Sequence, residues 1–247
     1  MGAPMTHLIV VVDIEGFSQR SDPVQWSLRR AMYEVLKTAV NDVHLAWADF
    51  QPQDRGDGVI MIVGGKVSPV TLAGELVRAL ESGLAEKEAM YNADHEMRFR
   101  VALHEGLVSP DDDGWSGDAI NTACRLVDAQ PLRDTLAEAR RAHVALIVSD
   151  SFYQSVIRPG HRSIDPSTFV SIALTIKNLI GITAWIHVPG YPAPPTLRTG
   201  ARARTTTPTR PPDEPELPGT SGIVINGNVK GDAVARDKHV YQQRRRR

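Results

Sequence analysis

The sequence lacks the features that mark several classes of protein. Cys124 is the single cysteine, which excludes a disulfide framework and a cysteine-based zinc site and fits a reducing cytoplasm. The formal charge of −1 gives no electrostatic reason to expect binding to nucleic acid. No stretch reaches the roughly 18 apolar residues that a membrane-spanning helix needs. We therefore expect a cytoplasmic protein without a membrane span or a nucleic-acid partner.

The composition of the chain changes along its length. The 247 residues are 42% hydrophobic and 23% charged, which is enough for one core of about 190 residues and a tail. Residues 1–188 predict a globular domain, and residues 189–221 a linker rich in proline, threonine and arginine. Residues 222–247 form a short β-prone motif rich in glycine, asparagine and valine, with a basic end.

The first informative stretch is an apolar run that ends in a carboxylate. Residues 8–12 are all apolar, which is typical of a strand buried on both faces. Asp13 follows at the strand end, and then Gly16 and Phe17. An Asp delivered to a sheet edge before a tight turn can hold a metal ion. Taken alone the pattern is also explained by a turn former or a helix cap.

The second stretch predicts a hairpin. Residues 54–58 are acidic and glycine-rich, and the apolar run 59–63 follows them, so two strands join with Asp57 at the tip. If this hairpin pairs beside the first strand, Asp13 and Asp57 face each other. Two carboxylates would then suit Mg²⁺ or Mn²⁺ bound to a triphosphate. An ordinary hairpin turn is the plainer alternative.

The third stretch predicts a helix that begins after a glycine- and serine-rich segment, 114–117. Asn121 and Arg125 are four residues apart, so they project from one face. An amide beside a guanidinium can bind a ribose oxygen and a phosphate that gains negative charge. A solvated polar face is the alternative for this helix considered alone.

Together, in this order and with the strand 100–108 (Arg-Val-Ala-Leu-His-Glu-Gly-Leu-Val), the stretches resemble the class III nucleotidyl cyclase catalytic domain. The resemblance covers roughly residues 6–188. It implies an α+β fold, a ferredoxin-like or palm-type sandwich with a mostly antiparallel sheet covered by helices. It also implies conversion of a nucleoside triphosphate to a cyclic monophosphate and pyrophosphate.

The resemblance assigns roles to individual residues. Two ions, Mg²⁺ or Mn²⁺, would be held at Asp13, Ile14 and Asp57. Asn121 and Arg125 would contact the ribose and the transition-state phosphates, and in the family they come from the opposite subunit, which implies a homodimer with composite sites. The residues at the remaining nucleotide-binding positions are Gly16, Phe17, Gln53 and Gly114. Lys177, at the end of a late predicted strand, is a further candidate for contact with the triphosphate.

The base-selecting positions differ from those of adenylate cyclases. Those enzymes have a lysine four residues before the second metal Asp and an Asp three residues before the helix glycine; this chain has Gln53 and Gly114 there. The guanylate cyclase pair is not present either. The domain looks most like the bacterial pyrimidine cyclases of Pycsar antiphage systems. That similarity implies cyclic UMP or cyclic CMP as a second messenger in antiviral defence.

Other segments complete the expected domain. Apolar residues spaced three and four apart predict helices over 23–43 and from residue 69, and further strands are expected over 98–108, 144–148, 169–177 and 183–188. Residues 110–114 are expected to be an acidic loop.

The tail carries a separate prediction. Nine prolines fall within residues 189–218, and residues 222–243 alternate short β-prone pieces with turn signals. This segment is similar to motifs by which bacterial signalling proteins assemble with effectors in amyloid-like arrays. An unstructured tail is the alternative.

Two other functions compete with an active cyclase. The chain could be an inactive cyclase-homology sensor or adaptor that binds nucleotide and acts through its tail, although all four family residues, Asp13, Asp57, Asn121 and Arg125, are present. A diguanylate cyclase or polymerase palm would share the metal chemistry. That class needs a Gly-Gly acidic hairpin, which the sequence does not contain at 54–58.

Overall fold

A computed structural model describes residues 2–90, 95–112, 114–161, 163–176 and 179–195. The strands are β1 (Met5–Ile14), β2 (Phe50–Asp54), β3 (Gly58–Val63), β4 (Phe99–Asp111), β5 (Gly114–Ser116), β6 (Val144–Ser149), β7 (Val170–Ile176) and β8 (Leu179–His187). The helices are α1 (Asp22–Asp42), α2 (Pro69–Thr71), α3 (Val77–Met90), α4 (Asp118–Val127), α5 (Gln130–Glu138) and α6 (Asp150–Phe152). Turns of 3₁₀ or π geometry occupy Phe17–Gln19, Trp47–Asp49, Leu72–Leu76, Tyr153–Ile157 and Pro166–Thr168.

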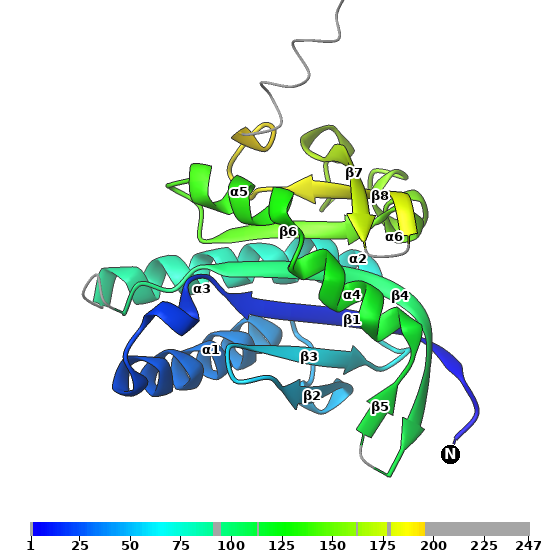
Figure 1. Ribbon diagram of the computed structural model, residues 1–247, viewed down its shortest axis with the longest axis horizontal. Coiled ribbons are helices and arrows are strands. Elements are labelled where there is room, and N and C mark those ends of the chain that lie inside the picture. The colour runs from blue at the N-terminus through cyan, green and yellow to red at the C-terminus, as the bar shows by residue number, and fades with distance from the viewer. Residues whose placement is uncertain (1, 91–94, 113, 162, 177–178, 196–247) are drawn as a thin grey trace, which may run out of the picture. The chain divides into compact units, whose positions relative to one another are not determined.

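One sheet organises the domain (Figure 1). Its strand order is β2-β3-β1-β4-β6-β8-β7, with β5 paired only to β4. The β4–β6 pair is parallel and the other pairs are antiparallel. The expected α+β fold, a mostly antiparallel sheet covered by helices, is therefore confirmed.

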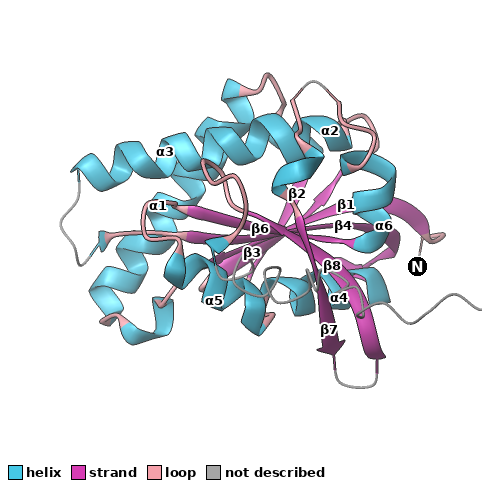
Figure 2. Ribbon diagram, turned by 90° about the horizontal axis from the view of Figure 1, so that it is seen from above, coloured by secondary structure: helices cyan, strands magenta, loops and turns pink. Residues whose placement is uncertain are grey.

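Helices cover both faces of the sheet. Figure 2 shows α2 and α3 on one side and α4 and α5 on the other. Side chains of a strand alternate between faces, so Val10, Val12 and Ile14 of β1 pack in the core under α1 and α3, whereas Ile9 and Val11 pack under α4 and α5. Two buried cores on a two-faced sheet explain why the strands β1, β3 and β6 are almost wholly apolar. Among the described residues, no helix is long and apolar enough to cross a membrane.

Two expected segments differ from the structure, and one helix was not expected. The expected loop at 110–114 is the end of β4, which pairs with β5 as a hairpin through Ser109–Ser116 and Pro110–Trp115. The helix α5 was not expected. The last strand starts earlier than expected, because β8 begins at Leu179 rather than near residue 183. Lys177 and the tail segments 196–221 and 222–247 lie outside the described residues.

A histidine between two glutamates joins α3 to the start of β6. The two ring nitrogens of His143 lie 2.9 Å from Glu81 Oε1 and 2.9 Å from Glu88 Oε2. Glu81 also accepts the backbone N–H groups of His143 and Val144, at 3.0 Å and 2.8 Å. Burial by itself lowers the pKa of His143, but the hydrogen bonds from the two carboxylates outweigh it and raise the pKa above its ordinary value.

This cluster predicts a pH dependence of stability. A histidine whose pKa is raised on folding stabilises the fold fully below its unfolded-state pKa of about 6.5, and that contribution disappears as the pH rises through the folded-state pKa. At pH 5.5, His143→Gln is expected to lower the melting temperature by about 2–4 °C, or ~1 kcal/mol in a domain of this size. Melting curves of both proteins from pH 5.5 to 9 should converge as the pH rises. A difference that is constant across that range would contradict the prediction.

Candidate active site

Asp13 lies near the carboxyl end of β1, on the face of the sheet that α4 covers. Because side chains alternate along a strand, Asp13 projects from the same face of β1 as Ile9 and Val11, which pack in the core under α4. Its backbone is paired with Gly58 of β3 on one side and with Arg100 of β4 on the other. The strand therefore delivers a carboxylate, 15% exposed, to the sheet surface beside both neighbouring strands.

Asp57 lies in the turn between β2 and β3, directly beside the end of β1. Gly56 has a φ of 87°, which favours glycine, and Arg55 N donates to the Gly58 carbonyl at 2.9 Å to close the turn. A Cβ at Gly58 would collide with the Val12 carbonyl oxygen, so glycine there lets the hairpin approach β1. Ile14 N donates to the Asp57 carbonyl at 2.9 Å. The predicted hairpin and its position beside the first strand are thus both present.

A buried arginine neutralises Asp13. The Arg100 guanidinium is hydrogen-bonded and ion-paired to the Asp13 carboxylate, and its side chain is only 8% exposed. Burial raises the pKa of Asp13 to about 6, although the Arg100 charge acts in the opposite direction; the nearby carboxylates of Asp57 and Asp128 raise it further. Arg100 Nε is buried and has no hydrogen-bond partner among the described residues. The site thus holds a cation and has donor capacity left for an anion.

Two adjoining cavities meet at the carboxylates. One of about 630 Å³ and one of about 350 Å³ share Asp13, Asp57 and Asp128 in their walls. The larger is also lined by Ile14, Glu15, Gly16, Phe17, Ser18, Gln19, Arg20, Arg100 and Arg133. The smaller adds residues of β1, the β2–β3 turn, β3 and α4: Val11, Val12, Arg55, Gly58, Val59, Ile60, Asn121, Cys124 and Val127. The structure therefore brings Asn121 of α4 to the same cavity as the two carboxylates.

The residues after Asp13 form the wall of the larger cavity. The Ile14 side chain is 1% exposed and packs in the core, so only its backbone faces the site, and its N–H is already bonded to Asp57. Gly16 has a φ of 66° and precedes the 3₁₀ turn that Phe17 begins. This turn places several backbone groups close to the carboxylates, which suits a phosphate-bearing ligand.

The helix α4 presents the predicted Asn–Arg pair. Its buried face consists of Ala119, Ile120, Ala123, Leu126 and Val127. Asn121 and Arg125 project from another face, as their spacing predicted. Asn121 lines the smaller cavity. Arg125 is half-buried and lines neither of the two cavities just described, so one chain alone does not bring this guanidinium to the carboxylates.

The two base-selecting positions line a third cavity, separate from the two that contain the carboxylates. Gln53 on β2 and Gly114 on β5 line one cavity of about 520 Å³, together with Gln51, Pro52, Asp54, Arg55 and Trp115. Trp115 Nε1 donates to Gln51 Oε1 at 2.8 Å and forms one wall. Gln53 Nε2 is buried without a hydrogen-bond partner among the described residues. Neither Asp13 nor Asp57 lines this cavity.

The donor set fits Mg²⁺ or Mn²⁺. Both ions prefer oxygen ligands, and Mg²⁺ in particular is commonly bound by one or two carboxylates together with substrate phosphates and water. Asp13 and Asp57 supply the carboxylates, and Arg100 shows that a positive charge is accommodated against Asp13. Within the described part of the chain, no group of three or more His, Cys, Asp or Glu residues is arranged around one point. A triphosphate would therefore complete the coordination.

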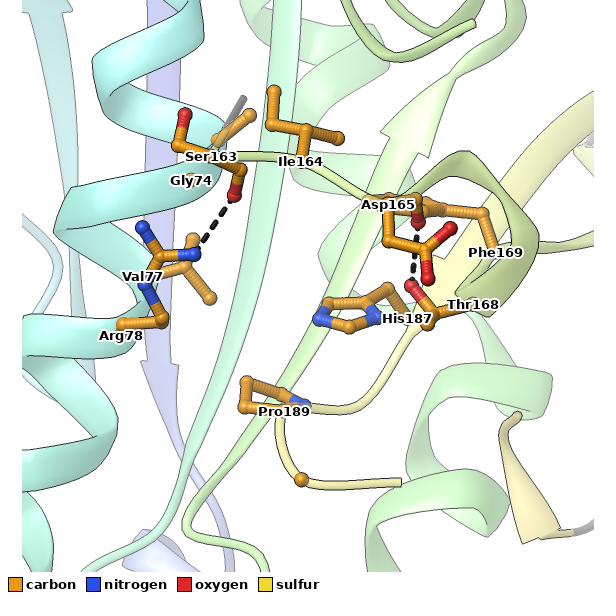
Figure 3. A pocket seen from close by; sticks show the side chains of 12 residues that line it. Gly74, Val77, Arg78, Ser163, Ile164, Asp165, Thr168, Phe169, His187 and Pro189 are labelled. Atoms are coloured by element: carbon orange, nitrogen blue, oxygen red, sulfur yellow. Dashed lines mark hydrogen bonds between the residues drawn. The ribbon is translucent and has the colours of Figure 1, made fainter. Parts of the chain in front are cut away.

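A further cavity of about 330 Å³ shares no residue with these three and lies between the start of α3, the segment 163–169 and the end of β8 (Figure 3). Arg78 Nη1 donates to the Ser163 carbonyl at 2.7 Å across it. Burial lowers the pKa of His187, which lines the cavity, to about 4, so the ring is neutral. Neither Asp13 nor Asp57, and neither residue of the Asn–Arg pair, lines this cavity.

Solved structures with the same architecture are cyclase domains. An adenylate/guanylate cyclase/hydrolase from Silicibacter pomeroyi superposes with a TM-score of 0.56 at 18% identity, covering 77% of this chain and all of that one. The guanylyl cyclase Cya2 gives 0.53 at 11% identity over 76% and 93%. A bacterial light-regulated adenylyl cyclase gives 0.51 at 16% identity over 82% and 58%.

The chain has the class III nucleotidyl cyclase fold. The fold that the sequence resemblance implied is thereby confirmed. No protein-family model and no curated protein matches the chain. Identities of 11–18% establish the fold alone, so the activity of this cyclase-fold protein rests on the chemistry of its site.

Sequence reasoning missed three charged residues of the site. Arg100 was quoted within its strand without a role, and Asp128 and Arg133, paired at 2.7 Å, were not considered. A partial signal for Arg100 was its charge between the apolar residues Phe99 and Val101, although that charge does not reveal its partner. His104, on the same strand, bonds through Nδ1 to Ser149 Oγ at 2.8 Å and lines none of these cavities.

Proposed function

We propose that the protein is a nucleotidyl cyclase that converts a nucleoside triphosphate to a 3′,5′-cyclic monophosphate and pyrophosphate. The observation that carries the proposal is the meeting of Asp13, Asp57 and Arg100 in one cavity at the end of β1. Two carboxylates bind divalent ions, and a buried guanidinium binds phosphate. In a cyclase the ribose 3′-oxygen bonds to the α-phosphorus, the hydroxyl loses its proton, and the bond to the pyrophosphate oxygen breaks.

We assign a separate role in this reaction to each residue of the site. Asp13 and Asp57 would hold two Mg²⁺ or Mn²⁺ ions, which when bound stabilise the attacking and leaving oxygens of an in-line displacement. Arg100, with an unpartnered Nε, would bind phosphate oxygens beside them. Asn121 would orient the ribose and Arg125 would stabilise the charge that develops on the phosphates.

We propose a homodimer with composite sites. In one chain, the cavity of Gln53 and Gly114 contains neither metal carboxylate, and Arg125 lines neither carboxylate cavity. A second copy that faces the first would bring these groups to the carboxylates. Because the arrangement is symmetric, each pair of chains would form two sites.

We propose a pyrimidine nucleoside triphosphate as substrate and a signalling role in antiphage defence. Gly114 has no side chain, so the Gln53 amide is the polar side chain of that pair left to read the base. An amide offers one donor and one acceptor group, which match the ring edge of uracil or cytosine.

The direct test is turnover with each of the four common triphosphates. The full chain would be incubated with ATP, GTP, CTP and UTP in separate Mn²⁺ reactions, and the products identified by mass. A dominant cyclic UMP or cyclic CMP is expected. A dominant cyclic purine nucleotide would support the cyclase activity but overturn the proposal of a pyrimidine substrate. Tight nucleotide binding without any product would favour the inactive sensor or adaptor instead.

The tail is proposed to recruit an effector through residues 222–243. A chain that ends at residue 195 is expected to keep wild-type turnover within about twofold, because every proposed site residue lies before residue 195 and contacts outside a site change rates little. The full chain, but not the shortened one, should form sedimentable assemblies. Loss of turnover on truncation would show that the tail serves the catalytic site.

A further inference from the structure

A carboxylate outside the metal pair ties the β2–β3 turn to helix α1. Asp54, the last residue of β2, accepts hydrogen bonds at both oxygens. Arg29 contacts it through Nε at 3.1 and 3.2 Å and through Nη2 at 2.8 Å. Tyr33 donates its hydroxyl hydrogen to Asp54 Oδ2 at 2.7 Å, and Gly56 N donates to Oδ1 at 2.8 Å.

The three donors come from two different parts of the fold. Arg29 and Tyr33 are four residues apart on α1, so they reach the hairpin from one helix face. Gly56 belongs to the turn itself and adjoins Asp57. A single side chain therefore connects a 21-residue helix, anchored in the core by Leu28 and Met32, to the backbone unit that carries the second metal carboxylate.

The turn has few other restraints. Strand pairing holds its two ends, Asp54 with Val59 and Gly58 with Asp13. Between them, the described residues give two backbone hydrogen bonds: Arg55 N to the Gly58 carbonyl, and Ile14 N to the Asp57 carbonyl. The Asp57 side chain is exposed, and Gly56 in the left-handed region imposes little steric restriction of its own. The position of the Asp57 carboxylate relative to Asp13 thus depends on how firmly the turn is held from the α1 side.

We propose that Asp54 is a positioning residue for metal binding: bridged to Arg29 and Tyr33, it fixes the turn so that Asp57 faces Asp13 at ion-binding distance. The inference rests on the proposed function. It adds a residue that is not itself a metal ligand and acts through Asp57, although Asp54 also lines the cavity of Gln53 and Gly114. Because binding sites work best when their ligands are held in place before the ion arrives, loosening the turn weakens ion binding first.

The network persists across the neutral pH range. Burial alone would raise the pKa of Asp54, but the hydrogen bonds from Arg29, Tyr33 and Gly56 outweigh it and hold that pKa below its ordinary value. Burial and the Asp54 carboxylate raise the pKa of Tyr33 to about 12. The acceptor stays charged and the donor stays protonated wherever the protein is assayed.

The test measures turnover of the full chain against Mn²⁺ concentration. Asp54→Asn keeps the size of the side chain and removes its charge. We expect about a tenfold higher Mn²⁺ concentration at half-maximal rate, the equivalent of ~1.4 kcal/mol. Tyr33→Phe, which removes one of the donors, should give a smaller shift of about two- to fourfold.

A matched control lies on the same helix. Glu34 is also an exposed carboxylate with two cationic partners, Arg30 at 3.2 Å and Lys87 at 2.8 Å, but it does not contact the hairpin. Glu34→Gln removes a comparable charge network, and its Mn²⁺ dependence should match that of wild type. This comparison separates the position of Asp54 from a general effect of deleting a surface carboxylate.

Two results would overturn the proposal. One is an Asp54→Asn curve that matches the Glu34→Gln curve; the other is a rate lowered equally at all Mn²⁺ concentrations, which marks a structural loss. Direct Mn²⁺ binding by calorimetry, without nucleotide, keeps the proposed function separate. If wild type binds Mn²⁺ and makes no product, the cyclase assignment fails while the binding constants of the variants still decide the role of Asp54. A wild-type chain that makes no product and binds no Mn²⁺ overturns both.

Discussion

Asp57→Asn is expected to lower turnover by a factor of about 10³ or more without destabilising the fold. A bound divalent ion contributes several kcal/mol of charge stabilisation in the transition state, and each 1.36 kcal/mol is a factor of ten in rate. The substitution keeps the size of the side chain and removes the charge that holds the ion. Because Asp57 is exposed, the melting temperature should stay close to that of wild type. Product formation under saturating Mn²⁺ and a melting curve measure the two effects.

The corresponding change at Asp13 is a less clean test. Asp13→Ala also removes the partner of Arg100, whose side chain is buried. Breaking a buried ion pair from one side costs about 3–5 kcal/mol, so inactivity could reflect unfolding. Asp42→Asn, at an exposed carboxylate that lines none of the cavities, is the control for Asp57→Asn. Undiminished turnover of Asp57→Asn would remove Asp57 from the site.

The second large effect is complementation between two inactive chains. Arg125→Ala is expected to be inactive because it lacks the guanidinium that stabilises the phosphates, a loss of about 10²–10³ for such a donor. If each site takes its carboxylates from one chain and Arg125 from the other, a mixed dimer of Asp57→Asn with Arg125→Ala has one intact site. An equal mixture that exchanges subunits should therefore recover about one quarter of wild-type turnover.

The double variant gives the matching control. A chain that carries both Asp57→Asn and Arg125→Ala should gain little when mixed with either single variant, because no pairing then contains an intact site. Turnover in the equal mixture of single variants that stays at the level of each alone, despite exchange shown by mass spectrometry, would place the whole site within one chain.

The sequence predicted those helices and strands in which the spacing of apolar residues matches the faces that are buried in the core. The helix α1 has its apolar residues at three- and four-residue spacing and packs that stripe on the core. The strands β1, β3 and β6 are apolar because both faces of the sheet are covered. For these segments the physical reason for the pattern and the observed burial are the same.

The missed elements have weak local signals. The helix α5 buries only Leu132, Thr135 and Leu136, too few for a clear stripe, although Pro131 near its start was an available sign. The hairpin of β4 and β5 was expected to be a loop because its residues are polar. Pairing across the hairpin satisfies the backbone there, and polarity along the strand does not oppose it.

The metal-binding carboxylates of the proposed site could be predicted from the sequence, because their position at strand ends is visible in a single segment. Asp13 and Asp57 stand out because each carboxylate follows or precedes an apolar strand. Arg100 and Asp54 do not, since their roles depend on register and on the packing of α1 against the hairpin. Arg100 faces Asp13 only because β4 pairs with β1 in this alignment, and a single sequence does not specify that alignment.

The central place of β1 in the sheet has a consequence for biosynthesis. This strand is synthesised before both of its partner strands, β3 and β4, and β4 pairs Val108 with Met5. At about 5–20 residues per second, roughly 5–20 s pass before both partners exist. Until β4 emerges, β1 can pair only with β3, and the open edge of such an apolar strand is prone to aggregate. Yield in the cell should therefore depend on chaperones that bind nascent chains, and slower translation should increase that dependence.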